Sequence, residues 1–303
     1  MLREKVVNVM KRKKKKVNLT HLVFIAPHMI IFIVFIVIPI FFGIYVSFTK
    51  WDLIGTPQWV GLDNYKEILF NTKSTFNRQF FDGLKNTVLF VIFNVPLCIV
   101  VPLAFALVLH IRPLGSKIYQ LVLYLPTLFS ITSVGLIWIQ LLNRRFGLAS
   151  VMGAKVQWAI TMPYAWIALM IMTVWWTMGS NMVIYQAALG SVPKEEYEAA
   201  EMDGAGWFTK LVKITIPSIR FQLLYTLVIT IAGSFNVYGQ PTIMTRVDLG
   251  AGPKINVLVQ YIRSIAFGSG QSAAGIASAM AVILGLFITI VSIIQFKMIR
   301  SED

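Results

Sequence analysis

Residues Gly190 to Phe221 read GSVPKEEYEAAEMDGAGWFTKLVKITIPSIRF and lie between two long apolar segments. Five of the thirteen acidic residues of the chain fall in this stretch: Glu195, Glu196, Glu198, Glu201 and Asp203. Pro193 suits the first turn of a helix, where a missing N–H costs nothing, and acidic side chains are favoured near the positive end of the helix. Gly204 accepts the left-handed backbone angles that end a helix. The stretch therefore predicts a short helix that ends at the Asp203-Gly204 pair.

A second helix is expected to begin at Ala205 and to end before Pro217, because its apolar residues recur at helical spacing. Two short helices joined by a tight glycine bend, held between membrane spans, have the shape of a docking element. The alternative is an amphipathic helix that rests on lipid. The acidic side chains argue against that alternative, because an anionic membrane surface would repel them.

The order of residues in this stretch resembles the "EAA" loop of importer permeases of the ATP-binding-cassette (ABC) superfamily. The matching positions are Glu198, Ala199, Ala200, Asp203, Gly204, Ala205, Ile214 and Pro217. Two positions depart from the family pattern: Ile216 stands where Leu is usual, and Phe221 stands where a second Pro often follows. The resemblance implies a cytoplasmic coupling loop that inserts into a cleft of a separate ATPase subunit, with Glu198 gripping a basic group there.

Composition places the chain in a membrane. Its 303 residues are 57% hydrophobic and 13% charged, with a mean hydropathy of +0.72, whereas a soluble domain usually carries about 25% charged residues. The single cysteine, Cys98, excludes a disulfide framework. Much of the net charge of +14 comes from the run Lys11 to Lys16 just before the first apolar segment. Such a run is a membrane-topology signal, so we expect no nucleic-acid partner.

The apolar segments predict an all-α polytopic membrane protein with six transmembrane helices, because about 20 apolar residues span a bilayer. We expect the spans near 22–48, 86–109, 118–142, 161–189, 219–240 and 273–297. Residues 1–20 would form a basic cytoplasmic tail and 21–303 a transmembrane permease domain, with the two-helix coupling loop at 190–221. The first apolar run is too long for a cleaved signal peptide, so we expect it to be retained.

The distribution of Lys and Arg predicts the orientation of the chain. With the N-terminus inside, the inner segments hold 16 of these residues and the outer segments 11. This bias predicts that the two termini and the coupling loop are cytoplasmic. The resemblance to importer permeases implies a multi-pass protein of the bacterial cell membrane. Two longer outer segments follow from the same topology. Residues 49–85 suggest a small ordered loop, and within 241–272 an amphipathic turn from Val257 to Ile265 is expected to rest against the membrane.

Several function classes are excluded by what the sequence lacks. No Asp, Glu, Lys or Arg lies in the interior of a predicted span, so an ion-coupled carrier is disfavoured. The chain has no G-x-x-x-x-G-K-[ST] loop, so ATP would be used by a partner subunit and no cofactor or metal is expected here. A membrane-embedded enzyme is the alternative class. Its support is poor, because the three histidines are far apart and no H-E-x-x-H or G-x-S-x-G motif occurs.

Further motifs are similar to those of carbohydrate-uptake permeases, of the maltose and glycerol-3-phosphate type, and to the first of the two paired permeases. They are Ala26-Pro27, Ile38-Pro39, Gly61 to Tyr65, Asn86-Thr87, Leu125-Pro126, Trp175-Trp176 with Gly179, and Gly275 to Ala279. One segment departs: the family often has T-x-G-G-P after the fifth span, whereas Thr245 to Pro253 reads TRVDLGAGP. The resemblance implies a second homologous permease, two cytoplasmic ATPase subunits, an extracellular or lipid-anchored solute-binding protein, and a sugar. Amino acid, peptide and polyamine import remain alternatives within the same mechanism.

A sugar pathway needs aromatic rings that stack on pyranose faces and amide or hydroxyl groups that bind hydroxyls. The candidates in the spans are Thr127, Trp176, Asn181, Phe235, Asn236 and Tyr238. The alternative is that Ser, Thr and Asn hydrogen-bond helices together and that Trp and Tyr mark the membrane interfaces. The absence of a cation within the spans weakly disfavours a strongly anionic solute.

Overall fold

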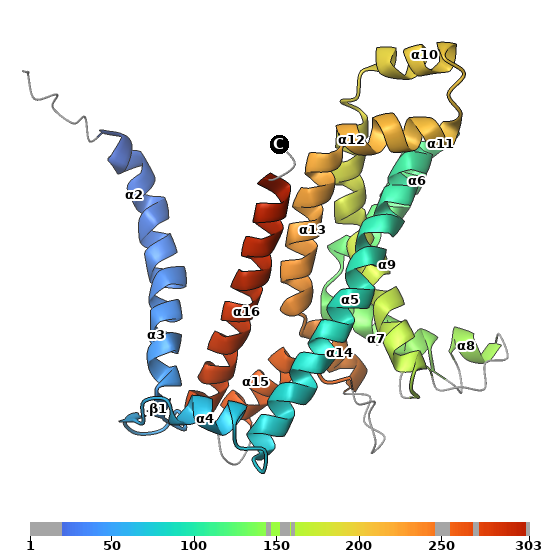
Figure 1. The fold of residues 1–303 in the computed structure, drawn as a ribbon. Coiled ribbons are helices and arrows are strands. Elements are labelled where there is room, and N and C mark those ends of the chain that lie inside the picture. The colour runs from blue at the N-terminus through green and yellow to red at the C-terminus, as the bar shows by residue number, and fades with distance from the viewer. Residues whose placement is uncertain are drawn as a thin grey trace, which may run out of the picture. The chain divides into compact units, whose positions relative to one another are not determined.

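The computed structural model describes residues 20–143, 147–151, 158, 161–245, 255–268 and 273–300, and Figure 1 traces their arrangement. The predicted basic tail lies outside these residues except for Thr20, and so does the departing loop beyond Thr245. The chain divides into two units, Met1–Tyr45 and Val46–Asp303. The described residues are overwhelmingly helical, and the single sheet among them joins two strands of two residues each. The predicted all-α class is confirmed.

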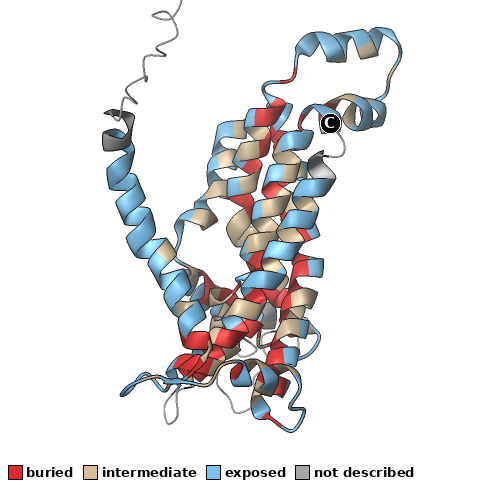
Figure 2. Cartoon of the chain, turned by 60° about the vertical axis from the view of Figure 1, so that its left-hand side comes forward, coloured by how far each residue is buried: buried red, intermediate tan, exposed pale blue. Residues whose placement is uncertain are grey.

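Membrane-spanning length is met by five of the described helices, or by six spans when one bent pair is counted as a span. The first runs from Phe24 to Ser47 and comprises α2 (Thr20–Phe32), the π-turn η1 (Ile33–Val37) and α3 (Ile38–Ser47). Figure 2 shows this helix as exposed along most of its length. A helix that is apolar on every side has no polar face for water and is suited to lipid.

The π-turn η1 follows from the proline after it. Pro39 has no N–H to donate, and its ring would clash with the carbonyl of the residue four positions earlier in an α-helix. The N–H of Ile38 instead bonds the carbonyl of Ile33, five residues back. This wider turn lets the apolar helix pass through a proline without a break.

Four long helices dominate the second unit: α5 (Thr75–His110), α9 (Tyr164–Leu189), α13 (Arg220–Phe235) and α16 (Ala274–Arg300). The 36 residues of α5 are about 54 Å long at 1.5 Å per residue, well beyond a hydrocarbon core of about 30 Å. This explains why the helix begins at Thr75 although the apolar span was predicted from residue 86. Its first turns extend past the apolar layer.

The predicted span 118–142 is not one helix. It consists of α6 (Ser116–Tyr124), the 3₁₀-turn η2 (Leu125–Leu128) and α7 (Ile131–Leu141), with a bend of 104° between the two arms. Pro126 lies in the 3₁₀-turn, and Ser130 starts a new helix because its Oγ accepts a hydrogen bond from the N–H of Ser133. Hydropathy alone does not reveal such a bend, because both arms are apolar.

The predicted span 219–240 is also interrupted. The helix α13 ends at Phe235, and α14 (Gly239–Thr245) begins after a short break. Pro241 lies in the first turn of α14, where no N–H is needed, so the break gives this proline an acceptable place. Asn236 therefore lies at a helix end within the membrane-spanning segment.

The remaining elements are short. The strands β1 (Thr49–Lys50) and β2 (Gln58–Trp59) pair antiparallel, with Thr49 opposite Trp59. They are followed by the helix α4 (Asp63–Leu69). Later in the chain come α8 (Leu148–Val151) and α15 (Leu258–Phe267). The four helical segments between residues 194 and 218 are described with the functional site.

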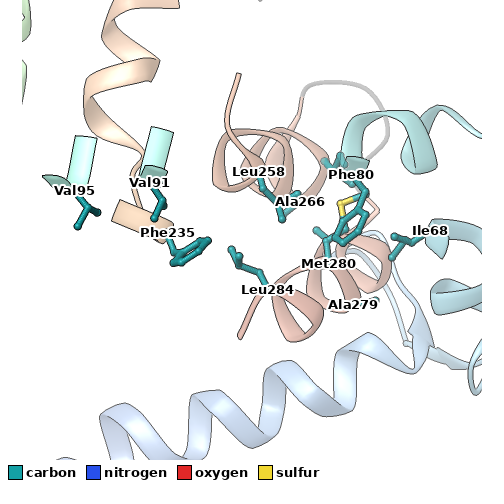
Figure 3. Packing of buried hydrophobic residues seen from close by; sticks show 12 residues of the cluster. Ile68, Phe80, Val91, Val95, Phe235, Leu258, Ala266, Ala279, Met280 and Leu284 are labelled. Carbon is teal, nitrogen blue, oxygen red and sulfur yellow. The ribbon is translucent and has the colours of Figure 1, made fainter. Parts of the chain in front are cut away.

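The core of the second unit consists of three clusters of buried side chains, and α5 contributes to each of them. Phe80, Val91 and Val95 belong to the first, Phe90 to the second, and Ala106 with its neighbours to the third. Figure 3 shows the first cluster, in which side chains of α5 meet those of α13, α15 and α16. The helix α5 is therefore the common support of the bundle.

Two motifs that resemble the sugar permeases meet at one place. The side-chain amide of Asn64 donates to the carbonyl oxygens of Ser47 and Thr49, at 2.8 and 2.9 Å. At the start of α16, Gly275 lies so close to this site that a Cβ would overlap the carbonyl oxygen of Thr49. The motif 61–65 and the motif 275–279 thus hold residues 47–49 against the start of α16.

The amphipathic segment 257–265 was expected to rest on the membrane, and this expectation is wrong. The helix α15 packs its apolar side chains into the first cluster, against α5 and α16. Thr87 Oγ1 accepts a hydrogen bond of 3.0 Å from the N–H of Leu258, and the Asn86 amide donates to the carbonyl of Asn256 at 2.9 Å. At Gly83 a Cβ would lie 2.8 Å from the Leu258 Cα, so the close approach requires glycine.

The contact at Gly275 leads to a stability prediction. Gly275→Ala should lower the thermal stability of the purified chain, because the added methyl group overlaps the Thr49 carbonyl and overpacking typically costs about 1–3 kcal/mol. Gly285→Ala in the same helix is the matched control, since nothing lies within 4 Å of its Cβ position. Replacing glycine by alanine within a helix stabilises it by about 0.5–1 kcal/mol. Thermal unfolding in detergent measures both, and equal midpoints for the two variants would contradict the described contact.

Candidate functional site

The predicted docking stretch forms two antiparallel helical segments, here called the coupling element. It comprises α10 (Lys194–Met202) and a continuous helical run of α11 (Trp207–Lys210), the π-turn η3 (Leu211–Thr215) and α12 (Ile216–Ser218). Figure 1 shows it at one end of the bundle, at the opposite end from α14 and α15. The prediction of two short helices joined by a glycine bend agrees with this geometry.

The bend at Gly204 is a helix-ending motif with two specific hydrogen bonds. The N–H of Ala205 bonds the carbonyl of Ala200 at 2.8 Å, and the N–H of Gly204 bonds that of Glu201 at 3.0 Å. This pairing is the Schellman motif, which needs a left-handed residue at its turn. Gly204 supplies it with a φ of +72°, and no atom lies within 4 Å of a Cβ placed there. The requirement for glycine is therefore conformational within this chain.

The second helix does not end before Pro217, as we expected; it continues to Ser218. The N–H of Ile216 bonds the carbonyl of Leu211, five residues back, as at the first π-turn. This wider turn accommodates the proline without a break. Thr215 Oγ1 also donates to the carbonyl of Lys210, at 3.3 Å.

Two side-chain contacts join the halves of the coupling element. Lys210 donates to the carboxylate of Glu201 across the bend. The hydroxyl groups of Tyr197 and Thr215 lie 2.9 Å apart and share a hydrogen bond. The hydrogen bond from Lys210 and the charge of this side chain lower the pKa of the Glu201 carboxyl. The element is therefore closed by its turn, an ion pair and a hydroxyl pair.

The residues that form these two side-chain contacts were not predicted from the sequence. Glu201 and Lys210 are nine positions apart across a turn, so helical spacing does not relate them. Tyr197 resembled a surface residue of an acidic helix, although it is half-buried and packs against the third cluster with Ile214. A tyrosine within an otherwise charged and alanine-rich helix was the one signal that the sequence offered.

The predicted motif residues have different surroundings. Ile214 packs against the third cluster, which includes the ends of α5 and α9, and so ties the element to the bundle. The exposed positions are Glu198, Ala199, Asp203, Gly204 and Pro217. Ala200 and Ala205 are half-buried. The exposed apolar side chains beside them are Met202, Trp207 and Phe208. This surface combines carboxylates with apolar side chains and suits a protein partner.

Thr127 and Trp176, two predicted pathway residues, lie where the bent segment meets α9. The Trp176 indole donates to the carbonyl of Phe129 at 3.1 Å, and Thr127 Oγ1 donates to that of Tyr124 at 2.7 Å. A Cβ on Gly179 would lie 2.5 Å from Thr127 Oγ1, so the two segments touch. The Trp176 bond joins α9 to the bent segment, which favours the alternative that this residue holds helices together, whereas Thr127 bonds within its own segment.

Asn181 lies between three helices. Its amide donates to the Cys98 carbonyl of α5 at 2.9 Å and to Thr230 Oγ1 of α13 at 3.4 Å. Cross-helix hydrogen bonds of this kind contribute about 0.6 kcal/mol on average within membranes. The position of Asn181 is explained by this packing.

Phe235, Asn236 and Tyr238 are neighbours in sequence but have separate surroundings. Phe235 is buried in the first cluster, edge-on to Phe287 with ring centroids 5.4 Å apart (Figure 3 shows it near Leu284). Asn236 is exposed at the end of α13 and donates to the carbonyl of Ala232. Tyr238 lines a cavity of about 450 Å³ between α14 and α15. Among the residues that the structure describes, the six predicted pathway side chains have separate surroundings.

The cavity at Tyr238 contains groups that the sequence argument did not connect. The guanidinium carbon of Arg263 lies 4.9 Å from the centroid of the Tyr238 ring, and Gln260 and Tyr261 also line the cavity. In the sequence analysis, Arg263 was only one of the basic residues counted in the outer segments. Because α15 folds onto the bundle, this cation lies beside a predicted pathway residue, which removes much of the argument against an anionic solute. Within the described ranges, no three His, Cys, Asp or Glu side chains are grouped as a metal site.

Comparison with known proteins places these features in a family. The family described as "Binding-protein-dependent transport system inner membrane component" matches residues 68–300, a range that includes the coupling element. The "Probable ABC transporter permease protein YesP" of Bacillus subtilis is 31% identical, over 94% of this chain and 92% of its own length. The "Arabinooligosaccharides transport system permease protein AraP" of Halalkalibacterium halodurans is 30% identical, over 90% and 85%.

A solved structure has the same fold. A chain in the crystal structure of "a bacterial ABC transporter involved in the import of the acidic polysaccharide alginate" superposes with a TM-score of 0.72 at 21% identity, covering 92% of this chain and 94% of that one. The resemblance seen in the loop therefore extends over the membrane helices. The chain belongs to the family of binding-protein-dependent transport system inner membrane components.

Proposed function

We propose that this chain is a transmembrane permease subunit of an ABC importer and forms half of the translocation pathway for a sugar or oligosaccharide. A second, homologous permease would complete the pathway, and two cytoplasmic ATPase subunits would supply the energy. An extracellular or lipid-anchored binding protein would deliver the solute. The names of the relatives support the sugar, since AraP is named for arabinooligosaccharides and the solved transporter for alginate. They favour it over amino acids, peptides and polyamines.

The observation that carries the proposal is the closed and anchored coupling element. A loop that transmits force must keep its shape under load and must be attached to the helices that move. The Schellman turn and the Glu201–Lys210 pair hold the shape, while Ile214 and Tyr197 attach the element to the bundle. Its exposed face, with Glu198 and the apolar Trp207, is left for a partner.

The cavity at Tyr238 supports a role in solute entry. It lies at the end of the bundle opposite the coupling element and is lined by aromatic rings, hydroxyl and amide groups, and Arg263. Such a lining can stack on a pyranose face and bind its hydroxyl groups. Asn236 is exposed at the nearby helix break. We retain Asn236 and Tyr238 as pathway residues.

Membrane orientation can be tested with single cysteines. In a background in which the buried Cys98 is replaced, Thr72→Cys should react with a membrane-impermeant thiol reagent from outside intact cells, and Lys194→Cys should not. Both positions are exposed in the folded chain, so a difference reports the side of the membrane. Permeabilised cells, in which both should react, provide the control. Labelling of only Lys194→Cys from outside would reverse the orientation and exclude a cytoplasmic ATPase at the coupling element.

The turn at Gly204 should be essential for coupling. Gly204→Val should abolish substrate-stimulated ATP hydrolysis in proteoliposomes, because a left-handed backbone costs an L-residue roughly 1–2 kcal/mol and a β-branched side chain suits it least. Gly204→Asn is the matched control, since asparagine adopts left-handed angles more readily. It should keep much of the stimulation. Equal stimulation in the valine variant and the unmodified protein would mean that the turn does not transmit coupling.

Glu198 should bind the ATPase directly. Glu198→Gln should reduce co-purification of the ATPase subunit, because removing one member of a buried charge pair costs about 2–5 kcal/mol. Glu196→Gln is the control, an exposed carboxylate two positions away that lies outside the matched motif. Its effect should be small. If both variants retain the ATPase equally well, Glu198 is not the gripping residue.

A further inference from the structure

The junction of α5 and α6 forms a cavity of about 570 Å³ that the proposed transport function does not use. Its walls come from the end of α5, the first turns of α6 and the last turns of α9. The polar residues that line it are His110, Arg112, Ser116, Lys117, Gln120 and Gln186. Figure 1 shows that these helix ends lie at the same end of the bundle as the coupling element.

The cavity is positively charged and has no acidic residue in its lining. Arg112 and Lys117 carry permanent charges at neutral pH. Neither lies within 4 Å of a carboxylate in the described ranges, where the ion pairs are Lys66–Asp63 and Lys210–Glu201. The described chain thus presents two cations to this cavity without a counter-ion, and an anion from outside the chain is the complementary ligand.

The backbone fixes the positions of these groups. Arg112 has a φ of +54°, and its N–H bonds the carbonyl of Leu109, so the chain turns sharply after α5. Gly115, with a φ of +80°, then precedes the first residue of α6. Arg112 and Lys117 are thereby placed on the two sides of one tight turn.

The source of the anion is indicated by the apolar residues around this turn. Leu114, at its tip, is fully exposed. The exposed apolar or aromatic side chains that continue from it are Ile111, Ile118, Tyr119, Leu121 and Val122. A basic pocket that opens beside an exposed apolar helix face fits a molecule with an anionic head and hydrocarbon chains. Basic pockets between helices at the membrane boundary bind anionic lipid headgroups in this way.

We propose that this cavity binds the phosphate of an anionic phospholipid headgroup, with the acyl chains on the exposed apolar face of α6. Arg112 and Lys117 hold the phosphate, and the His110 imidazole and the Ser116 hydroxyl lie in the same lining. The side-chain amides of Gln120 and Gln186 also line the cavity and can bind the hydroxyl groups of a glycerol headgroup, so phosphatidylglycerol fits the site better than phosphatidic acid.

The site adjoins the coupling element. Ala187 and Gly190, at the end of α9, also line the cavity, and α10 begins four residues after Gly190. A lipid bound here braces the helix end from which the coupling element leaves the bundle. The inference goes beyond the proposed function, and its test needs neither a transported solute nor an ATPase.

The experiment is native mass spectrometry of the full chain in detergent, titrated with phosphatidylglycerol and, separately, with neutral phosphatidylcholine. The unmodified chain should retain phosphatidylglycerol preferentially. The double variant Arg112→Asn with Lys117→Gln should lose the preference by about five-fold for each charge removed, or about 1 kcal/mol per basic side chain. Asparagine is chosen because it tolerates the left-handed backbone at residue 112.

Controls separate this site from general charge. Lys73→Gln with Arg78→Gln removes the same charge from exposed positions at the other end of the unit and should keep the preference. Gln186→Leu should reduce the preference for phosphatidylglycerol over phosphatidic acid. Circular dichroism checks that each variant is folded. An unchanged preference in the folded Arg112 and Lys117 double variant would overturn the proposal, and so would equal losses in the two double variants. Displacement of the lipid by inorganic phosphate at similar concentration would mean a free-anion site.

Discussion

Backbone amide and carbonyl groups need hydrogen-bond partners, most strictly in hydrocarbon, and this need accompanies each change of helix form in this chain. At each such position, backbone N–H or C=O groups that would otherwise lack a partner form a hydrogen bond. Before Pro39 and Pro217 the helix widens into a π-turn. At Ser130 the side chain accepts the first N–H of a new helix, and at Gly204 two carbonyls are bonded by the turn itself. At each of these positions a specific hydrogen bond is formed where the regular helix is interrupted.

A bundle with this backbone still needs close contacts between helices, because lipid offers little hydrophobic driving force for their association. The chain achieves them with glycines at chosen positions. Because these glycines have no side chain, other segments approach them closely: the start of α15 at Gly83, the bent segment at Gly179 and the carbonyl of Thr49 at Gly275. Each contact joins segments far apart in sequence. The long helix α5 carries the contact at Gly83 and contributes to all three buried clusters, which gives the second unit a common support.

Hydropathy and motif spacing predicted much of the fold and the coupling element, because both depend on local sequence. Long apolar runs indicate spans wherever they occur, and Asp203-Gly204 indicates a helix end. What failed depended on contacts between distant segments. Pro217 looked like a helix end, but the rule does not include the wider turn that accommodates it. The segment 257–265 has an apolar face that lipid or protein could cover, and only the fold decides which.

The candidate pathway shows the same limit. Trp176 and Asn181 have the right chemistry for sugar, but the structure supplies each with a helix partner. Tyr238 gains a cation beside its ring from a helix that starts twenty residues later. Neighbouring positions such as Phe235 and Asn236 diverge, since one points into the core and the other marks a helix end. Residue type narrows the candidates, and only the surroundings select among them.

The π-turn before Pro217 also sets how the side chains of the second coupling helix are oriented around its axis. A change from π to α geometry alters the residue count of one turn, and each residue corresponds to about 100° of rotation around the helix axis. That change is blocked, because an α-turn would press the proline ring against the carbonyl of Lys213. Residues 207–210 therefore keep a fixed rotation about the helix axis relative to residues 216–218. A single proline thus fixes which side chains of this helix lie on its outer face.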